Sequence, residues 1–364
     1  MTTVLVTGAG GPAGRALGSQ LAARAAAGAD LTWVGVDITP VTDPNYPATD
    51  LAPRADAWDY ATGMRDLILK HAPDLVLPTV QDELPQIAVL AQALDRSSDG
   101  DAATGIGVTG SPGTASAVPG PFPDAVGPVL TPDPGPAAIA ADKLLTMLAL
   151  DRAGVPVPRF ALPTDFGGVA EALAWARGPI VLKPRVSRGG RGVRLVESPA
   201  DLTDLTGAED TTGADGTDGS GEAAWSALDA SWIVQSFAPG TEYCPQLYRP
   251  RTGTGTITAV VLEKTELKQG RVGNAAAVVR PRAGTLPDVE HVARRAVEAL
   301  GLTGPADLDI RRDTTGAPLV LEINGRFGAN SDHAPELLDT ALAHGGHPHG
   351  QHPHGQAPHG QAPR

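Results

Sequence analysis

The chain has 364 residues, 41% of them hydrophobic and 19% charged, so it is long enough and apolar enough for two or three globular domains. Its formal net charge of −13 argues against a general binder of nucleic acid or of anionic membranes, because both surfaces repel an acidic protein. One cysteine excludes an internal disulfide, and no run approaches the ~18 apolar residues that cross a bilayer, so a cytoplasmic protein is expected.

The first part of the chain, up to about residue 95, alternates short apolar segments with helical stretches. This alternation is typical of a parallel sheet whose strands are joined by crossover helices, so an α/β, Rossmann-like unit is expected. The expected strands are 3–7, 31–37 and 75–79, and the expected helices are 15–27, 61–71 and 83–94.

Two later segments break the periodic pattern. Residues 97–136 are rich in Gly, Pro, Ser and Thr and predict a loop with a short strand at 105–109, whereas the acidic, Gly/Thr-rich residues 206–222 predict a disordered insertion. Around them, helices are expected at 137–152 and 289–300, strands at 180–183, 193–196, 232–237, 257–263 and 275–280, and a hairpin of 307–311 with 319–324.

The end of the chain repeats His-Pro-His-Gly-Gln and Ala-Pro-His-Gly-Gln, and six of the nine histidines lie from residue 344 onward. A segment of this composition cannot form a core, so residues 346–364 are predicted to be a disordered, solvated tail. Chelation of a metal by its histidines is the alternative interpretation.

A glycine-rich motif, Gly8–Gly14, lies between the first expected strand and helix, and Asp37 ends the next strand. This pattern is typical of a dinucleotide site and favours a nicotinamide-dependent oxidoreductase as an alternative function. However, Pro12 removes one N–H from the turn, and no tyrosine has a lysine four residues on, as the Tyr/Lys pair of a common reductase class requires. A tight strand-to-helix connection without a dinucleotide is therefore the preferred interpretation.

A second glycine-rich segment follows the apolar strand 180–183. The strand delivers Lys183 to the loop Ser-Arg-Gly-Gly-Arg-Gly at 187–192, after which the chain turns into another strand. Because glycine tolerates positive φ, successive N–H groups of such a loop can point into one concavity and hold phosphate oxygens. Lysine at the base of the loop would add a point charge beside an α- or β-phosphate.

The expected hairpin near residue 315 groups three oxygen-bearing side chains. If its loop is Thr315-Gly316, Asp309 lies opposite Glu322, and alternation puts Asn324 on the same face. Two close carboxylates repel each other without a cation, and hard oxygen ligands without His or Cys point to Mg²⁺ that bridges nucleotide phosphates. The apolar face is expected to hold Leu308, Ile310, Leu319, Leu321 and Ile323.

In their order along the chain, these motifs resemble the ATP-grasp superfamily, and within it the carbamoyl-phosphate-synthetase-like ligases. The resemblance rests on Asp-Lys at 142–143, the strand that carries Lys183, the 187–192 loop, Gln-Ser-Phe-Ala-Pro-Gly-Thr-Glu at 235–242 and Glu-Ile-Asn-Gly-Arg at 322–326. It implies a Rossmann-like pre-ATP-grasp domain at 1–135 and a two-lobed α+β ATP-grasp domain at 136–345. The lid lobe would span about 160–232 and carry the 206–222 insertion.

The resemblance also implies a role for each matching residue. ATP phosphates would be contacted by Lys143 and Lys183, and the 187–192 loop (Ser187, Gly189, Gly190 and Gly192) would close over them. Adenine would meet a hinge formed by Gln235, Ser236 and Phe237, and the ribose hydroxyls would meet Glu242. Mg²⁺, or Mn²⁺, would be held by Asp309, Glu322 and Asn324, with Arg326 and Lys183 as the catalytic cations.

The sequence therefore predicts an ATP- and Mg-dependent ligase that activates a small carboxylate as an acyl phosphate for attack by an amine. An oxidoreductase that uses Gly8–Gly14 and a non-catalytic ATP-binding protein remain the alternatives. Substrate contacts are expected from the first domain and from residues 263–271 and 330–333, with Lys264 and Lys268 either substrate contacts or surface charges. The acid, the amine and the oligomeric state, with a homodimer as one alternative, stay open.

Overall fold

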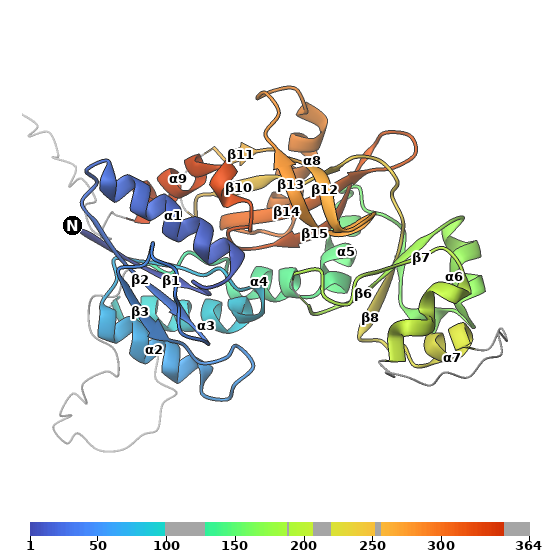
Figure 1. The fold of residues 1–364 in the computed structure, drawn as a ribbon, viewed down its shortest axis with the longest axis horizontal. Coiled ribbons are helices and arrows are strands. Elements are labelled where there is room, and N and C mark those ends of the chain that lie inside the picture. Colours follow the sequence, from blue (N-terminus) through green and yellow to red (C-terminus); the bar gives the residue numbers. More distant parts are fainter. Residues whose placement is uncertain (99–127, 188, 207–219, 252–255, 346–364) are drawn as a thin grey trace, which may run out of the picture.

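The structure is a computed structural model that describes residues 1–98, 128–187, 189–206, 220–251 and 256–345, and the strands in these ranges form three sheets (Figure 1). The predicted strand at 105–109, most of the predicted 206–222 insertion and the predicted tail at 346–364 lie outside the described residues. Within the described ranges, no helix combines the length and hydrophobicity that a membrane crossing requires.

The first sheet is parallel and has the strand order β3–β2–β1–β4. One face packs Val4 and Val6 against Leu17 and Leu21 of α1, and the other packs against α2 and α3, so the predicted Rossmann-like unit is confirmed. Strand β3 was not predicted, because it is a short, mostly exposed edge strand. The elements are β1 (Thr2–Thr7), α1 (Pro12–Ala26), β2 (Leu31–Asp37), β3 (Ala48–Leu51), α2 (Tyr60–His71), β4 (Leu75–Leu77), η1 (Gln81–Glu83) and α3 (Leu84–Ser98).

The prediction of one helix at 137–152 is wrong, because the segment forms two helices, α4 (Pro134–Ala141) and α5 (Lys143–Arg152). Asp142 between them is extended, and its carboxylate accepts hydrogen bonds from the N–H groups of Leu144 and Leu145. The same carboxylate pairs with Arg185 at 2.6 Å. An aspartate that caps α5 thus breaks the helix and makes Lys143 its first residue.

The second sheet is antiparallel, has the order β5–β8–β6–β7 and is covered by α6 and α7 (Figure 1). Its elements are β5 (Phe160–Ala161), η2 (Pro163–Asp165), α6 (Val169–Ala176), β6 (Ile180–Pro184), β7 (Arg194–Val196), η3 (Pro199–Thr206), α7 (Ser220–Ser226) and β8 (Trp232–Ser236). The predicted bounds of the disordered insertion are too wide, because Thr206 belongs to η3 and residues 220–222 begin α7.

The largest sheet has the order β11–β10–β14–β9–β12–β13, with β15 paired to the other edge of β14. Helices α5 and α8 pack on its apolar face, while α9 joins it to the core of the first sheet. The strand predicted at 257–263 is wrong, because β11 ends and β12 begins within it. The elements are β9 (Glu242–Tyr243), β10 (Gln246–Arg249), β11 (Thr258–Val260), β12 (Glu263–Gln269), β13 (Val272–Val279), α8 (Pro287–Ala299), β14 (Gly304–Arg312), β15 (Pro318–Asn324), η4 (Ser331–His333) and α9 (Pro335–Gly345).

The β14–β15 hairpin keeps the predicted register only in its inner half. Asp309 lies opposite Glu322 as expected, but the register shifts by one residue between Asp309 and Ile310, which pairs with Val320. This bulge turns Val320 into the core and leaves Leu321 half-buried at the cavity, so the predicted apolar face is wrong for Leu319 and Leu321. The loop is also longer than Thr315-Gly316, because Arg312 pairs with Pro318 and Asp313 caps the turn between them.

Candidate active site

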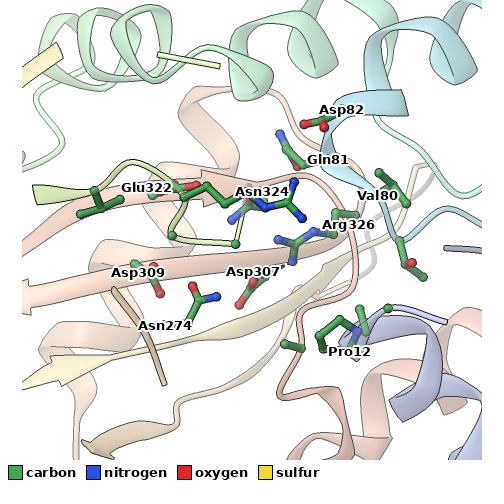
Figure 2. Close-up of a pocket in the computed structure, with 18 of the residues that line it drawn as sticks. Pro12, Val80, Gln81, Asp82, Asn274, Asp307, Asp309, Glu322, Asn324 and Arg326 are labelled. Carbon is green, nitrogen blue, oxygen red and sulfur yellow. Dashed lines mark hydrogen bonds and ion pairs between the residues drawn. The ribbon is translucent and has the colours of Figure 1, made fainter. Parts of the chain in front are cut away.

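A large cavity of about 960 Å³ lies where residues of all three sheets meet. One wall is the polar face of β14 and β15, and the opposite side contains Pro12, Val80 and Gln81 from the first unit (Figure 2). The glycine loop after β6 closes a third side through Gly189 and Gly190. The cavity is large enough to hold a nucleotide and a further small molecule, since typical ligand pockets measure roughly 300–1,000 Å³.

Four of the side chains that line the cavity come from the inner half of the hairpin's polar face. Asp309 is the direct partner of Glu322, and Asp307 is the direct partner of Asn324. Direct partners in an antiparallel pair project to the same side, so three carboxylates and one amide share a single wall. Asp307 was missing from the sequence analysis, although the alternation that groups Asp309 with Glu322 also includes it.

The oxygen donors of this wall suit a hard divalent cation. Asp309 and Glu322 are 30% and 22% exposed, so their carboxylates are open to the cavity, whereas Asn324 is nearly buried. Among the described residues there is no group of three or more His, Cys, Asp or Glu side chains placed to hold a metal. Because Mg²⁺ takes few protein ligands and completes its shell with phosphate oxygens and water, the oxygen donors of two carboxylates and an amide fit such an ion.

Lys264, on β12, bridges Asp309 of this wall and Glu242 of β9. Its ammonium lies 2.6 Å from both Glu242 and Asp309, and its side chain is only 3% exposed. Although burial alone would lower it, the attraction of Asp309 and Glu242 raises the pKa of Lys264. The interpretation of Lys264 as a surface charge is therefore wrong, whereas Lys268 on the same strand is exposed at the cavity.

The two lysines assigned to ATP phosphates lie beside the hairpin acids. Lys183 is buried at the end of β6 and lines the cavity; burial lowers its pKa, with the attraction of Glu322 and the repulsion of Lys143 acting in opposite directions. Lys143 does not line the cavity directly. Its ammonium is 3.6 Å from a carboxylate oxygen of Glu322 and 3.1 Å from both the carbonyl and the hydroxyl oxygen of Ser187.

The glycine loop has the backbone shape that its sequence predicts. Gly189, Gly190 and Gly192 all have φ between +65° and +74°, which favours glycine. Gly189 and Gly190 line the cavity, and a Cβ on Gly190 would lie 3.4 Å from the Asn274 side chain. Ser187 and Gly192 do not line it: Ser187 binds Lys143, and a Cβ on Gly192 would meet the ring of Pro184 at 2.8 Å.

The segment assigned to adenine binding connects the second sheet to the largest one. Gln235, Ser236 and Phe237 all line the cavity. The Ser236 N–H donates to the carbonyl of Arg159, and the Phe237 N–H donates to that of Pro179. Within the described ranges the next N–H, that of Ala238, makes no hydrogen bond, so this residue, which sequence analysis missed, offers a free backbone donor at the cavity.

The two remaining predicted residues are engaged within the protein. Glu242 is nearly buried, with Lys264 at 2.6 Å and Arg311 at 3.3 Å from its two oxygens, and it still lines the cavity. Arg326 also lines the cavity, and it pairs with Asp307 at 2.7 Å (Figure 2). The assignments of ribose binding to Glu242 and of catalysis to Arg326 remain predictions.

The first glycine motif forms the far end of the same cavity. Its Gly10 N–H donates to Asp37 at 2.9 Å, and its Gly11 N–H donates to the carbonyl of Gly8. A Cβ on Gly14 would lie 2.3 Å from that carbonyl, so this glycine is required for packing. Pro12 lacks an N–H, and the N–H groups of Gly10 and Gly11 bond within the protein, so these three positions offer no donor to an anion. This favours the tight connection over a pyrophosphate site.

Glu83 is a buried acid at the edge of this cavity that sequence analysis did not single out. Its carboxylate accepts hydrogen bonds from the hydroxyls of Thr7 and Tyr60, and a long one from the Val80 N–H. Burial raises the pKa of Glu83 from its ordinary 4.5 to about 7, and the hydrogen bonds from Thr7 and Tyr60 only partly oppose this rise.

Replacement of Glu83 by glutamine is expected to remove a pH-dependent loss of stability. Because the folded-state pKa is raised, the folded protein keeps a proton that the unfolded chain has lost, and stability falls as the pH rises from 4.5 to about 7. The full shift corresponds to roughly 3 kcal/mol. Urea unfolding should therefore show that the free energy of unfolding falls less between pH 5 and pH 8 for Glu83→Gln than for wild type. The exposed control Glu298→Gln should lose as much as wild type. Parallel curves for Glu83→Gln and wild type would contradict this assignment.

Comparison with known proteins gives the family. Residues 140–330 match the ATP-grasp domain. The uncharacterized protein y4rH of Sinorhizobium fredii is 29% identical over 216 residues, which are 58% of this chain and 41% of y4rH. A D-alanine–D-alanine ligase of Gloeobacter violaceus is 26% identical over 223 residues, which are 56% of this chain and 65% of the ligase.

Because the domain match covers more than half of the chain, the protein belongs to the ATP-grasp family, and the predicted superfamily resemblance is confirmed. The fold agrees: N5-carboxyaminoimidazole synthetase from Staphylococcus aureus, solved with ADP, superposes with a TM-score of 0.63 at 16% identity, over 95% of this chain and 77% of the synthetase. The chain spans between 41% and 65% of the length of the curated relatives that it matches.

Proposed function

We propose that this protein is an ATP- and Mg-dependent ligase that joins a small carboxylate to an amine. The observation that carries the proposal is the register of β14 and β15, which puts Asp309 opposite Glu322 on one wall of the cavity that Lys183 and the glycine loop also line. The cavity thus contains both carboxylate oxygens that can hold a divalent metal ion and a lysine that can contact phosphates. Relatives named as D-alanine–D-alanine ligases support the same reaction class.

In the proposed reaction, the chain's own residues hold ATP across the cavity. The free Ala238 N–H meets adenine beside the hinge, and Leu321 supplies an apolar wall. Lys183 neutralises phosphate charge directly. Because burial disfavours its charged ammonium, the nearby phosphate in turn stabilises that charge. Lys143 holds Ser187 and so fixes the base of the glycine loop, which closes over the phosphates and excludes water.

Asp309, Glu322 and Asn324 are the residues that would hold Mg²⁺. Bound there, the ion would neutralise and align the phosphates of ATP. A substrate carboxylate oxygen then bonds to the γ-phosphorus while the bond to the ADP oxygen breaks, and Arg326 neutralises the charge of the transferring group. The amine nitrogen next attacks the acyl carbon of this acyl phosphate, loses a proton and releases phosphate. Positioning and charge neutralisation supply most of the catalysis.

The test is a screen for ADP release with Mg²⁺ against pooled amino acids and small carboxylic acids. We expect ADP to appear with a particular acid and to rise when a matching amine is added, with the amide identified by mass spectrometry. ATP binding without ADP release from any pool would favour a non-catalytic nucleotide-binding protein. Binding of NADPH but not of ATP, measured by fluorescence titration, would favour an oxidoreductase that uses Gly8–Gly14.

A further inference from the structure

Arg326 is anchored by only part of its guanidinium group. The Nη1 atom donates to Asp307 Oδ2 at 2.7 Å and to the carbonyl of Phe327 at 3.0 Å. In the part of the chain that the structure describes, the Nε and Nη2 atoms make no hydrogen bond or ion pair. The side chain is 15% exposed and points into the cavity (Figure 2). One nitrogen is thus fixed, and two are left for a ligand.

Asp307, the residue that fixes Arg326, is itself held in place. Its Oδ1 atom accepts a hydrogen bond of 2.5 Å from Gln246, which is almost fully buried and also donates to the carbonyl of Cys244. The backbone leaves room for this arrangement because residue 328 is glycine. A Cβ there would lie 2.5 Å from Asp307 Cγ and 2.7 Å from Gln246 Oε1, closer than any side chain tolerates.

Asp307 differs from the other acids of the wall in the cation that lies next to it. Asp309 pairs with Lys264, and Glu322 lies beside Lys143, whereas the cation next to Asp307 is Arg326. The side chains of Asp307 and Arg326 are each only 15% exposed, so the pair is largely shielded from water. A buried carboxylate is costly without its partner, so Asp307 and Arg326 form one unit.

We infer that Asp307 is a positioning residue: it holds one nitrogen of Arg326 so that the other two face the transferring phosphoryl group. The inference rests on the proposed function, in which Arg326 neutralises that group. A planar guanidinium serves two oxygens only when its plane is fixed, because its donors form a rigid fork. The ion pair to Asp307, the support from Gln246 and the space at Gly328 together fix that plane.

A double-mutant cycle tests the inference by ADP release. Asp307→Asn should lower kcat by about 100-fold and change the KM for ATP by less than about threefold, because it disturbs the transition state rather than nucleotide binding. In an Arg326→Ala background, Asp307→Asn should have almost no further effect, because the residue that it positions is gone. Asp151→Asn, an exposed acid on α5, is the matched control and should leave kcat unchanged.

The outcomes separate the inference from the proposed function. Independent, additive losses in the cycle, or a raised KM for ATP with unchanged kcat, would overturn the positioning role while the ligase activity stands. A wild type that releases no ADP with any acid would overturn both. Melting temperatures confirm that each variant is folded; if Asp307→Asn does not fold, Gln246→Met replaces it and should give about a tenfold fall in kcat, again absent in the Arg326→Ala background.

Discussion

Glu322→Ala should lower the kcat for ADP release by at least about a thousandfold, or roughly 4 kcal/mol of activation free energy. Glu322 is the direct partner of Asp309 on the hairpin wall and also lies 3.6 Å from Lys143. The substitution removes one of two carboxylates assigned to Mg²⁺, whose charge neutralisation is worth several kcal/mol in such reactions. The loss should shrink as Mg²⁺ is raised if it arises from weakened metal binding.

Glu266→Ala is the matched control for this substitution. Glu266 is an exposed glutamate on β12 that does not line the cavity, so its removal should leave kcat and the Mg²⁺ dependence unchanged. Circular dichroism and melting temperature would show whether Glu322→Ala is folded. Wild-type turnover in a folded Glu322→Ala protein would refute the metal site and, with it, the proposed ligase mechanism.

Lys264→Met should lower the free energy of unfolding by about 3–5 kcal/mol in the absence of Mg²⁺, because it leaves two acids without their shared cation. Lys264 lies 2.6 Å from both Glu242 and Asp309, and Glu242 is nearly buried. Adding Mg²⁺ should raise the melting temperature of this variant by more than that of wild type. A divalent ion at Asp309 would replace the lost ammonium, whereas in wild type it competes with Lys264.

Lys268→Met provides the comparison, since it removes an exposed lysine of the same strand. Its stability and its response to Mg²⁺ should match those of wild type. A Lys264→Met protein as stable as wild type would show that the ion pairs contribute nothing to the fold. An equal response of both proteins to Mg²⁺ would argue against Asp309 as a metal ligand.

Much of the fold could be predicted because its periodic patterns are local. Strand β2 and helix α2 follow the apolar spacing within one residue at each end. Failures occurred where a tertiary contact overrides the local pattern. Asp142 caps α5 through Leu144 and Leu145, but an aspartate within an alanine- and leucine-rich run can equally lie on the exposed face of one continuous helix. The pair with Arg185, which holds the same carboxylate, lies 43 residues later in the chain and has no local signal.

The candidate site was predictable to the extent that alternation along a strand reveals a shared face. Asp309 and Glu322 were paired correctly, yet Lys264 remained ambiguous, since a lysine in a polar strand has the same local sequence whether it is buried or exposed. Ala238 gave no signal at all, because its contribution is a backbone N–H left free by the bonds of its neighbours. Such features depend on long-range packing and hydrogen bonding.

The bulge at Leu321 separates two registers within the hairpin. Beyond it, Val320 anchors the outer arm in the core, while Glu322 and Asn324 on the near side keep their own register with β14. A change in the length of the loop at 313–317 can therefore be taken up by a shift at the bulge, without changing the pairing of Asp309 with Glu322. We expect insertions, deletions and substitutions in this loop to leave that pairing intact.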